Sequence, residues 1–196
     1  MKFGAIDIGS NAVRLLITNV FESETGPIFK KSSLVRVPIR LGEDVFMNGF
    51  IGEEKQRRMI QTMGAFKLLL DVHGVASYRA CATSAMRNAT NSEELVEKIS
   101  EQAGIDIEII QGKKEADIIF SNHFEEHLFG DRSYLYIDVG GGSTELTIFS
   151  NNKPVASRSF RIGTIRLLNN MVEAEYWDKL LDWVEEHTKG MEKLEG

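Results

Sequence analysis

The chain has 196 residues, of which 42% are hydrophobic, so it can bury the core of one large domain or two small ones. Its formal net charge of −6 argues against a general nucleic-acid-binding surface, and no apolar stretch approaches the length that crosses a membrane. The single cysteine, Cys81, excludes a disulfide framework, and the early acid Asp7 argues against a signal peptide. We therefore expect a cytoplasmic protein. From its charge and hydropathy, we expect that it binds neither nucleic acid nor a membrane.

Apolar periodicity predicts the elements of the first 130 residues. Pro38 indicates either an edge strand or the end of a strand, and Gly74 and Gly104 stand where helices end. Asn91 with Glu94 resembles a capping box at a helix start. The expected elements are a hairpin over 2–20, a strand over 28–39, a turn at 40–44, a helix over 53–73, a strand over 78–83, a helix from 91 to 103, a strand over 105–110 and a helix from 113 to about 129.

The remaining residues repeat the opening pattern. We expect strands over 134–139 and 144–149, a turn at 151–154, a third strand that ends near 161 and a helix around 180–184. This order predicts a mixed α/β protein with an internal duplication. The natural boundary lies near residue 130, so we expect a first domain over residues 1–130 and a second over 131–196.

Two bends with the same spacing carry the strongest functional signal. Asp7-Ile-Gly-Ser10-Asn11 and Asp138-Val-Gly140-Gly141-Gly142-Ser143 each follow an apolar strand and precede another. Glycine lets consecutive N–H groups point together at an anion, and the Asp can hold a divalent cation that neutralises it. Because the arrangement occurs twice, we favour phosphate or metal handling over the commoner role of a lone Asp, which caps a turn. Neither bend matches a nucleotide P-loop or a dinucleotide fingerprint.

Other residues allow a functional and a plain structural interpretation. Glu115 in the first turn of a helix could act as a general base, although such residues are usually surface acids. Arg87 directly after a strand could reach a phosphoryl group or form a structural salt bridge. Ser143 and Thr144 could bind phosphate or their own backbone. Arg14 and Glu145, each seven residues after its Asp, could be outward-facing strand residues. Arginines such as Arg166 could form a basic patch, but most are expected to be solvated surface charges.

Four motifs in order resemble the exopolyphosphatase and guanosine pentaphosphate phosphohydrolase (Ppx/GppA) family. They are Asp7-Ile-Gly-Ser-Asn11 with Arg14, Ala82-Thr-Ser-Ala-Met-Arg87, Gly112-Lys-Lys-Glu115-Ala116 and Asp138-Val-Gly-Gly-Gly-Ser-Thr-Glu145. The resemblance covers about residues 3–168 and implies the two-lobed, ribonuclease H-like α/β fold of the actin, hexokinase and Hsp70 superfamily. It also implies Mg²⁺-dependent hydrolysis of a terminal phosphoanhydride in inorganic polyphosphate or guanosine pentaphosphate.

The same resemblance assigns roles by position. Glu115 is similar to the family's catalytic base and Arg87 to its transition-state cation. Residues 140–143 with Ser10 and Asn11 resemble the phosphate cradle. Asp138 resembles the carboxylate that binds the metal and orients water, Glu145 matches another acid of the cleft, and Asp7 is a further candidate for metal binding.

The chain also departs from the family pattern, because family members continue past residue 196 and complete the second lobe there. We therefore expect either a fragment or a short relative that pairs with another chain, for example as a homodimer. Two competing functions stay open. One is an ATP-dependent phosphotransferase of the same superfamily, and the other is a noncatalytic domain that binds polyphosphate or an alarmone.

Overall fold

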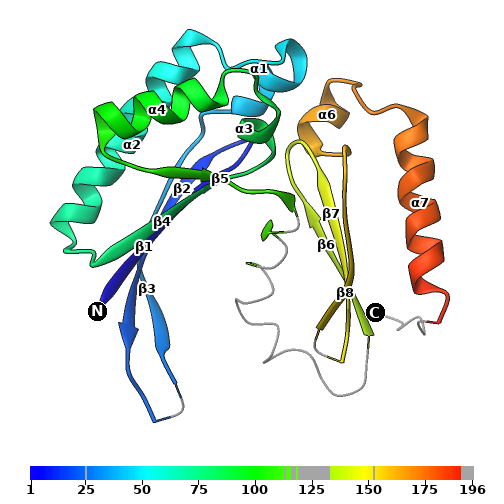
Figure 1. The fold of residues 1–196 in the computed structure, drawn as a ribbon, viewed down its shortest axis with the longest axis horizontal. Helices are drawn as coiled ribbons and strands as arrows, with labels where there is room; N and C mark the ends of the chain where they lie inside the picture. Colours follow the sequence, from blue (N-terminus) through cyan, green and yellow to red (C-terminus); the bar gives the residue numbers. More distant parts are fainter. Residues whose placement is uncertain (25, 113, 116–117, 119–132, 152, 191–196) are drawn as a thin grey trace. The chain divides into compact units, whose positions relative to one another are not determined.

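The computed structural model describes residues 1–24, 26–112, 114–115, 118, 133–151 and 153–190 (Figure 1). The chain divides into two compact units, Met1–Ile110 and Gln111–Gly196. The domain boundary expected near residue 130 lies outside the described residues. Nowhere in the described part of the chain is a helix both long and apolar enough to cross a bilayer.

The first unit is built on a five-stranded mixed sheet. The order is β3-β2-β1-β4-β5, in which β1, β2 and β3 are antiparallel neighbours and β4 and β5 run parallel to β1. The edge position of β3 confirms the expectation from Pro38, which follows that strand directly. The strands are β1 (Lys2–Ile8), β2 (Val13–Phe21), β3 (Ile28–Val37), β4 (Ser77–Ala82) and β5 (Ile107–Ile109).

Two helices cover one face of this sheet. These are α2 (Glu53–Val72) and α4 (Ser92–Ala103), which contact each other (Figure 1). Burial alternates along β1, where Ile6 and Ile8 lie under the helices and Asp7 on the opposite face is exposed. This alternation is the reason that the hairpin was predictable, since a strand with one covered face buries every second side chain. Gly74 and Gly104 follow the two helices with φ of 63°, as expected.

Two expectations for the first unit are wrong. The turn expected at 40–44 is instead the start of α1 (Leu41–Asn48), which has acids in its first turn and buries Val45 and Phe46. Eight residues are too few for a clear helical period. The capping box at Asn91 does not form, because the Asn91 amide accepts from the N–H of Ile51 (2.9 Å) and donates to its carbonyl (2.9 Å). Another short helix, α3 (Ser84–Asn88), also lacked a periodic signal.

The second unit contains a three-stranded antiparallel sheet in the order β6-β7-β8. Its elements are β6 (Ser133–Val139), β7 (Thr144–Ser150), β8 (Lys153–Phe160), α6 (Thr164–Leu168) and α7 (Ala174–Thr188). The strands and α7 confirm the prediction, whereas the short α6 was missed. Most of the helix expected over 113–129 lies outside the described residues, but residues 112, 114, 115 and 118 are helical.

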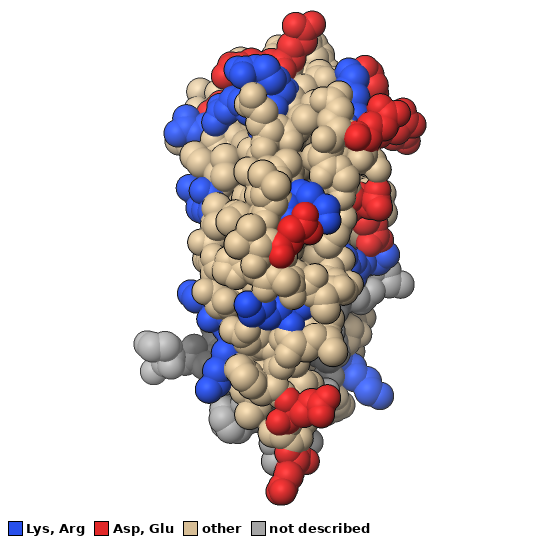
Figure 2. Space-filling view, turned by 90° about the vertical axis from the view of Figure 1, so that its left-hand side faces the viewer, with Lys and Arg blue, Asp and Glu red and all other residues tan. Residues whose placement is uncertain are grey.

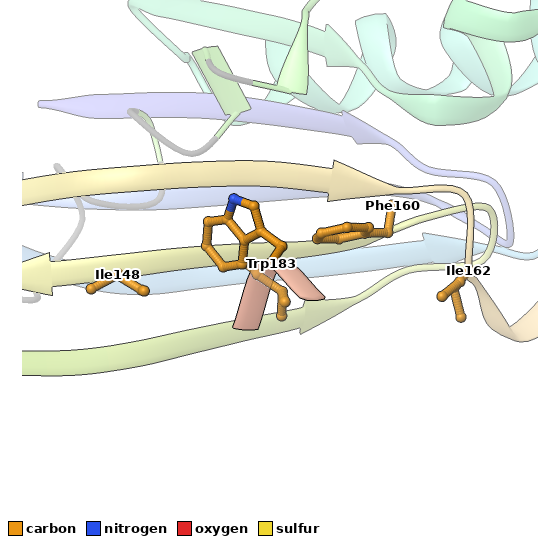
Figure 3. Packing of buried hydrophobic residues seen from close by; sticks show 5 residues of the cluster. Ile148, Phe160, Ile162 and Trp183 are labelled. Atoms are coloured by element: carbon orange, nitrogen blue, oxygen red, sulfur yellow. The ribbon is translucent and has the colours of Figure 1, made fainter. Parts of the chain in front are cut away.

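One face of this sheet carries the core of the second unit. Trp183 of α7 packs edge-on against Phe160, with ring centroids 6.0 Å apart (Figure 3). Leu146, Ile148 and Ile162 complete this cluster. These contacts also determine which residues lie on the opposite face of the sheet. Because side chains alternate along β7, Glu145 and Thr147 point away from α7.

Candidate functional site

The loop at 140–143 is held from one side by the segment that follows β8. The N–H of Gly140 closes the hairpin by donating to the carbonyl of Ser143 (2.8 Å). Three successive loop carbonyls are bound by three successive residues. The N–H of Thr164 donates to Gly140 (3.0 Å), the N–H of Ile165 to Gly141 (2.8 Å) and Nε of Arg166 to Gly142 (2.8 Å).

This pattern determines where the loop N–H groups point. In a trans peptide, the C=O of one residue and the N–H of the next lie in one plane and point in opposite directions. With the carbonyls of residues 140–142 turned toward the segment at 164–166, the N–H groups of Gly141, Gly142 and Ser143 point away from it. Consecutive N–H groups with a common direction form an anion-binding concavity.

The first unit holds its own loop in the same manner. Gly9 donates to the carbonyl of Ala12 (3.1 Å), Gly42 to Ser10 (2.9 Å) and Arg40 to Asn11 (2.9 Å). The duplication therefore extends beyond the hairpins to the helices that follow the third strands, α1 and α6. The Ser10 hydroxyl is buried and shares a hydrogen bond with Oγ of Ser84 (2.8 Å), whereas Asn11 is exposed.

The two repeats differ at the residue opposite the Asp. In the first unit, Asp7 pairs in register with Arg14, and Nη1 of Arg14 lies 2.8 Å from Oδ2 of Asp7. In the second unit, the register partner of Asp138 is Glu145. Directly opposed strand residues share one face, with Cα atoms about 5 Å apart. The first pair is neutral, while the second brings two acids together at the start of the glycine loop.

The acid pair lies in a polar and largely covered environment. Glu145 is only 7% exposed, and its Oε1 accepts a hydrogen bond from the Ser159 hydroxyl (2.7 Å). Tyr136, two residues before Asp138 on the same face, is half-buried. Burial and, to a smaller extent, the negative charge of Asp138 raise the pKa of Tyr136 above its ordinary value. Two opposed carboxylates are a donor set that suits Mg²⁺, which usually takes one or two protein carboxylates together with water and substrate phosphates.

Glu115 belongs to the same unit as the acid pair. A Cβ placed on Gly112 would lie 3.5 Å from Cβ of Ser159, the residue that binds Glu145. The N–H of Glu115 donates to the carbonyl of Gln111 (3.0 Å), so Glu115 lies one helical turn, about 5 Å, along from this contact. Its side chain is half-buried. The segment of Glu115 thus begins over the face of the sheet that carries the two acids.

Arg87 lies in the first unit, in the last turn of α3. Its Nη1 donates to the carbonyl of Ile110 (2.7 Å), which anchors the guanidinium near the end of β5. The structure therefore groups the sequence-derived candidates by unit. Asp138, Glu145, Glu115 and residues 140–143 belong to the second unit, and Asp7, Ser10, Asn11 and Arg87 belong to the first.

Comparison with known families matches residues 22–183 to the Ppx/GppA phosphatase family. The chain belongs to this family. A relative from Fusobacterium nucleatum named bifunctional 3-dehydroquinate synthase/phosphatase is 34% identical over 96% of the chain and 30% of that protein. Exopolyphosphatase 1 of Mycobacterium bovis is 28% identical over 85% of the chain and 48% of that protein.

Solved Ppx/GppA structures superpose on most of the chain. An exopolyphosphatase from Cytophaga hutchinsonii matches with a TM-score of 0.78 and 30% identity over 96% of the chain, and a PPX-GPPA enzyme from Aquifex aeolicus matches with 0.75 and 26% over 98%. The expected α/β fold class is confirmed, and it is the fold of these solved Ppx/GppA structures. The chain spans 61% and 64% of these two solved chains, and half or less of the two curated relatives.

The sequence does not single out Ser159 and Gly163 near the Ppx/GppA motifs, and it offers Arg166 only as one arginine of a possible basic patch. Ser159 binds Glu145, and Gly163 lies so close to the loop that a Cβ there would be 2.5 Å from the carbonyl oxygen of Gly141. Arg166 is 7% exposed, whereas we expected a surface charge. The available signal was the spacing Gly163-Thr-Ile-Arg166 after a third strand, the position that α1 occupies in the first repeat.

The hydroxyl of Thr144, the first residue of β7, binds the backbone of the segment after β8. Oγ1 of Thr144 donates to the carbonyl of Ile162 (2.7 Å), so this hydroxyl supports the backbone. Ser143 is buried at 8% exposure. Away from the loops, Figure 2 shows one face on which basic and acidic side chains are intermixed. No broad surface of one sign covers the described residues drawn on that face.

Proposed function

We propose that this chain carries the catalytic groups of a phosphoanhydride hydrolase that removes the terminal phosphate from inorganic polyphosphate with Mg²⁺. Membership of the Ppx/GppA phosphatase family and the names of its exopolyphosphatase relatives support the reaction class. The observation that carries the proposal is the opposed pair Asp138 and Glu145 beside a loop whose N–H groups share one direction. Opposed like charges destabilise a sheet, and a cation bound between them would offset that cost.

The chain's own residues can then be given roles. The N–H groups of residues 141–143, with Ser10 and Asn11 on the other loop, bind phosphate oxygens, and Arg87 balances the charge that develops on the transferred group. Glu115 accepts a proton from water as the water oxygen attacks the terminal phosphorus. The anhydride P–O bond breaks, which yields orthophosphate and a polymer shorter by one unit.

Asp138 and Glu145 would hold the metal ion. When bound, Mg²⁺ supplies charge neutralisation for the phosphate chain and orientation of the reacting oxygens. Asp7 is the weaker metal candidate, because one of its oxygens already pairs with Arg14. Guanosine pentaphosphate, which ends in the same type of anhydride, is proposed as a second substrate. A homodimer and a cytoplasmic location stay predictions.

The decisive experiment measures orthophosphate release from polyphosphate and from guanosine pentaphosphate, with and without Mg²⁺. Glu115→Gln should lower the rate by about 100-fold or more, because it removes the general base while keeping the side-chain shape. Glu101→Gln, an exposed acid on α4, is the matched control and should retain the rate. No release from either substrate, or an unchanged rate in Glu115→Gln, would favour the noncatalytic binding domain. Transfer from ATP to an acceptor would favour the phosphotransferase.

A further inference from the structure

We propose that Arg166 is a positioning residue that sets the direction and donor strength of the N–H groups in the loop at 140–143. The inference rests on the proposed function of this loop as a phosphate cradle. Arg166 is 7% exposed, and its Nε donates to the carbonyl of Gly142 at 2.8 Å. Its side chain comes from α6, which lies outside the motifs that the sequence singled out.

The contact acts on the next residue through the peptide plane. The carbonyl of Gly142 and the N–H of Ser143 belong to one trans peptide, so holding the oxygen fixes the direction of the hydrogen. A cation at the carbonyl also polarises the peptide group and makes its N–H a stronger donor. Arg166 therefore orients and strengthens the Ser143 N–H as a donor to an anion, although it contacts the carbonyl side of the same peptide.

The first repeat shows that this contact is not a general requirement of the hairpin. Gly42 and Ile165 donate to matching carbonyls, so the residues that follow them, Glu43 and Arg166, occupy matching positions. Glu43 binds Nζ of Lys55 (3.1 Å), and the carbonyl of Asn11 accepts the N–H of Arg40 instead. Among the residues that the structure describes, a buried guanidinium contacts the loop only in the repeat with the opposed acids.

Burial and a neighbouring cation both act against the positive charge of Arg166. Burial and then the positive charge of Arg161 lower the pKa of Arg166 from its ordinary value, although an arginine remains a cation at neutral pH. Two neighbouring cations repel each other, and an anion bound at the adjacent loop would offset this repulsion. Asp138 and Glu145 on one side of the loop and Arg166 on the other fit a site that holds a metal ion and phosphate together.

The test is a titration of the ¹⁵N-labelled chain with tripolyphosphate, followed through backbone amide shifts of Gly141, Gly142 and Ser143. Arg166→Met removes both the charge and the hydrogen bond, and Arg166→Lys keeps the charge but lacks Nε. Both should bind tripolyphosphate about tenfold more weakly than the unaltered chain, a loss typical of one charge-assisted hydrogen bond. Arg57→Met, an exposed arginine on α2, is the control and should not change the affinity.

The same spectra separate positioning from folding, since the dissociation constant is read from peaks of the folded state alone. Affinity in Arg166→Lys equal to that of the unaltered chain would show that only charge matters and would overturn the inference. Equal affinity in both variants would overturn it as well. If the three amides of the unaltered chain do not respond to tripolyphosphate, the proposed function of the loop fails, and the inference fails with it.

Discussion

Gly163→Ala tests the contact between the glycine loop and the segment that supports it. The backbone at Gly163 is extended, with φ −150° and ψ 161°, which any residue can adopt, so the substitution brings no conformational strain. Its methyl group, however, would lie 2.5 Å from the carbonyl oxygen of Gly141 and 2.6 Å from the carbonyl carbons of Gly141 and Gly142. These are backbone atoms, which cannot turn aside as a flexible side chain would.

The size of the effect follows from this geometry. To restore an ordinary contact of 3.4 Å, the loop and the start of α6 must separate by about 0.9 Å. Such overpacking costs about 1–3 kcal/mol of stability, and a displacement of about 1 Å at a catalytic loop can cost about 100-fold in rate. The loss of stability should appear in urea unfolding, and the loss of rate should appear in orthophosphate release from polyphosphate.

Gly64→Ala is the matched control. Gly64 lies inside α2, and a Cβ there would meet nothing within 4 Å. This change should stabilise the fold by about 0.5–1 kcal/mol and leave the rate unchanged. If Gly163→Ala keeps both the stability and the rate of the unaltered chain, the close contact between Gly163 and the loop backbone would be contradicted.

Three further predictions concern the second unit. Glu145→Gln should raise the free energy of unfolding by about 0.2–1 kcal/mol while it lowers phosphate release, because it removes an opposed like charge; a loss of stability in urea would contradict this. In NMR titrations of the Tyr136 ring, its raised pKa should fall partway toward the ordinary value in Asp138→Asn or on addition of Mg²⁺, and an unmoved pKa would place the charge elsewhere. The same raised pKa means that stability declines as pH rises above about 10, where the unfolded chain loses this proton first. Trp183→Ala should cost about 3–5 kcal/mol in urea unfolding, against less than about 1 kcal/mol for exposed Trp177→Ala; equal costs would refute the assigned core.

The elements that the sequence predicts well are those with a long hydrophobic period. Both hairpins, α2 and α7 have one face against a core, and that face repeats along the chain at the period of the element. The short helices α1, α3 and α6 offer five to eight residues, too few for a period to stand out. Their boundaries are set by contacts with distant loops, such as Gly42 with Ser10.

For the candidate site, the sequence supplies the residues but not their partners. The motif spacing indicates that Arg14 and Glu145 occupy matching positions, yet it leaves open whether they face outward. Burial decides this, because the Arg14 side chain is 43% exposed whereas Glu145 is 7% exposed. Strand register adds the partners, since it joins Asp7 to Arg14 and Asp138 to Glu145 and so makes one pair neutral and the other acidic. The burial of Arg166 could not be predicted, since its partner, the carbonyl of Gly142, is a backbone atom 24 residues away.

We propose that the two repeats have diverged and that the acid pair of the second holds the metal ion for hydrolysis. The most direct measurement compares orthophosphate release from polyphosphate, in Mg²⁺, by Asp138→Asn and Asp7→Asn. Asp138→Asn should lose at least about tenfold more activity than Asp7→Asn, since loss of one metal ligand costs more than loss of an exposed ion pair. Equal losses in the two variants, or a larger loss in Asp7→Asn, would contradict the account.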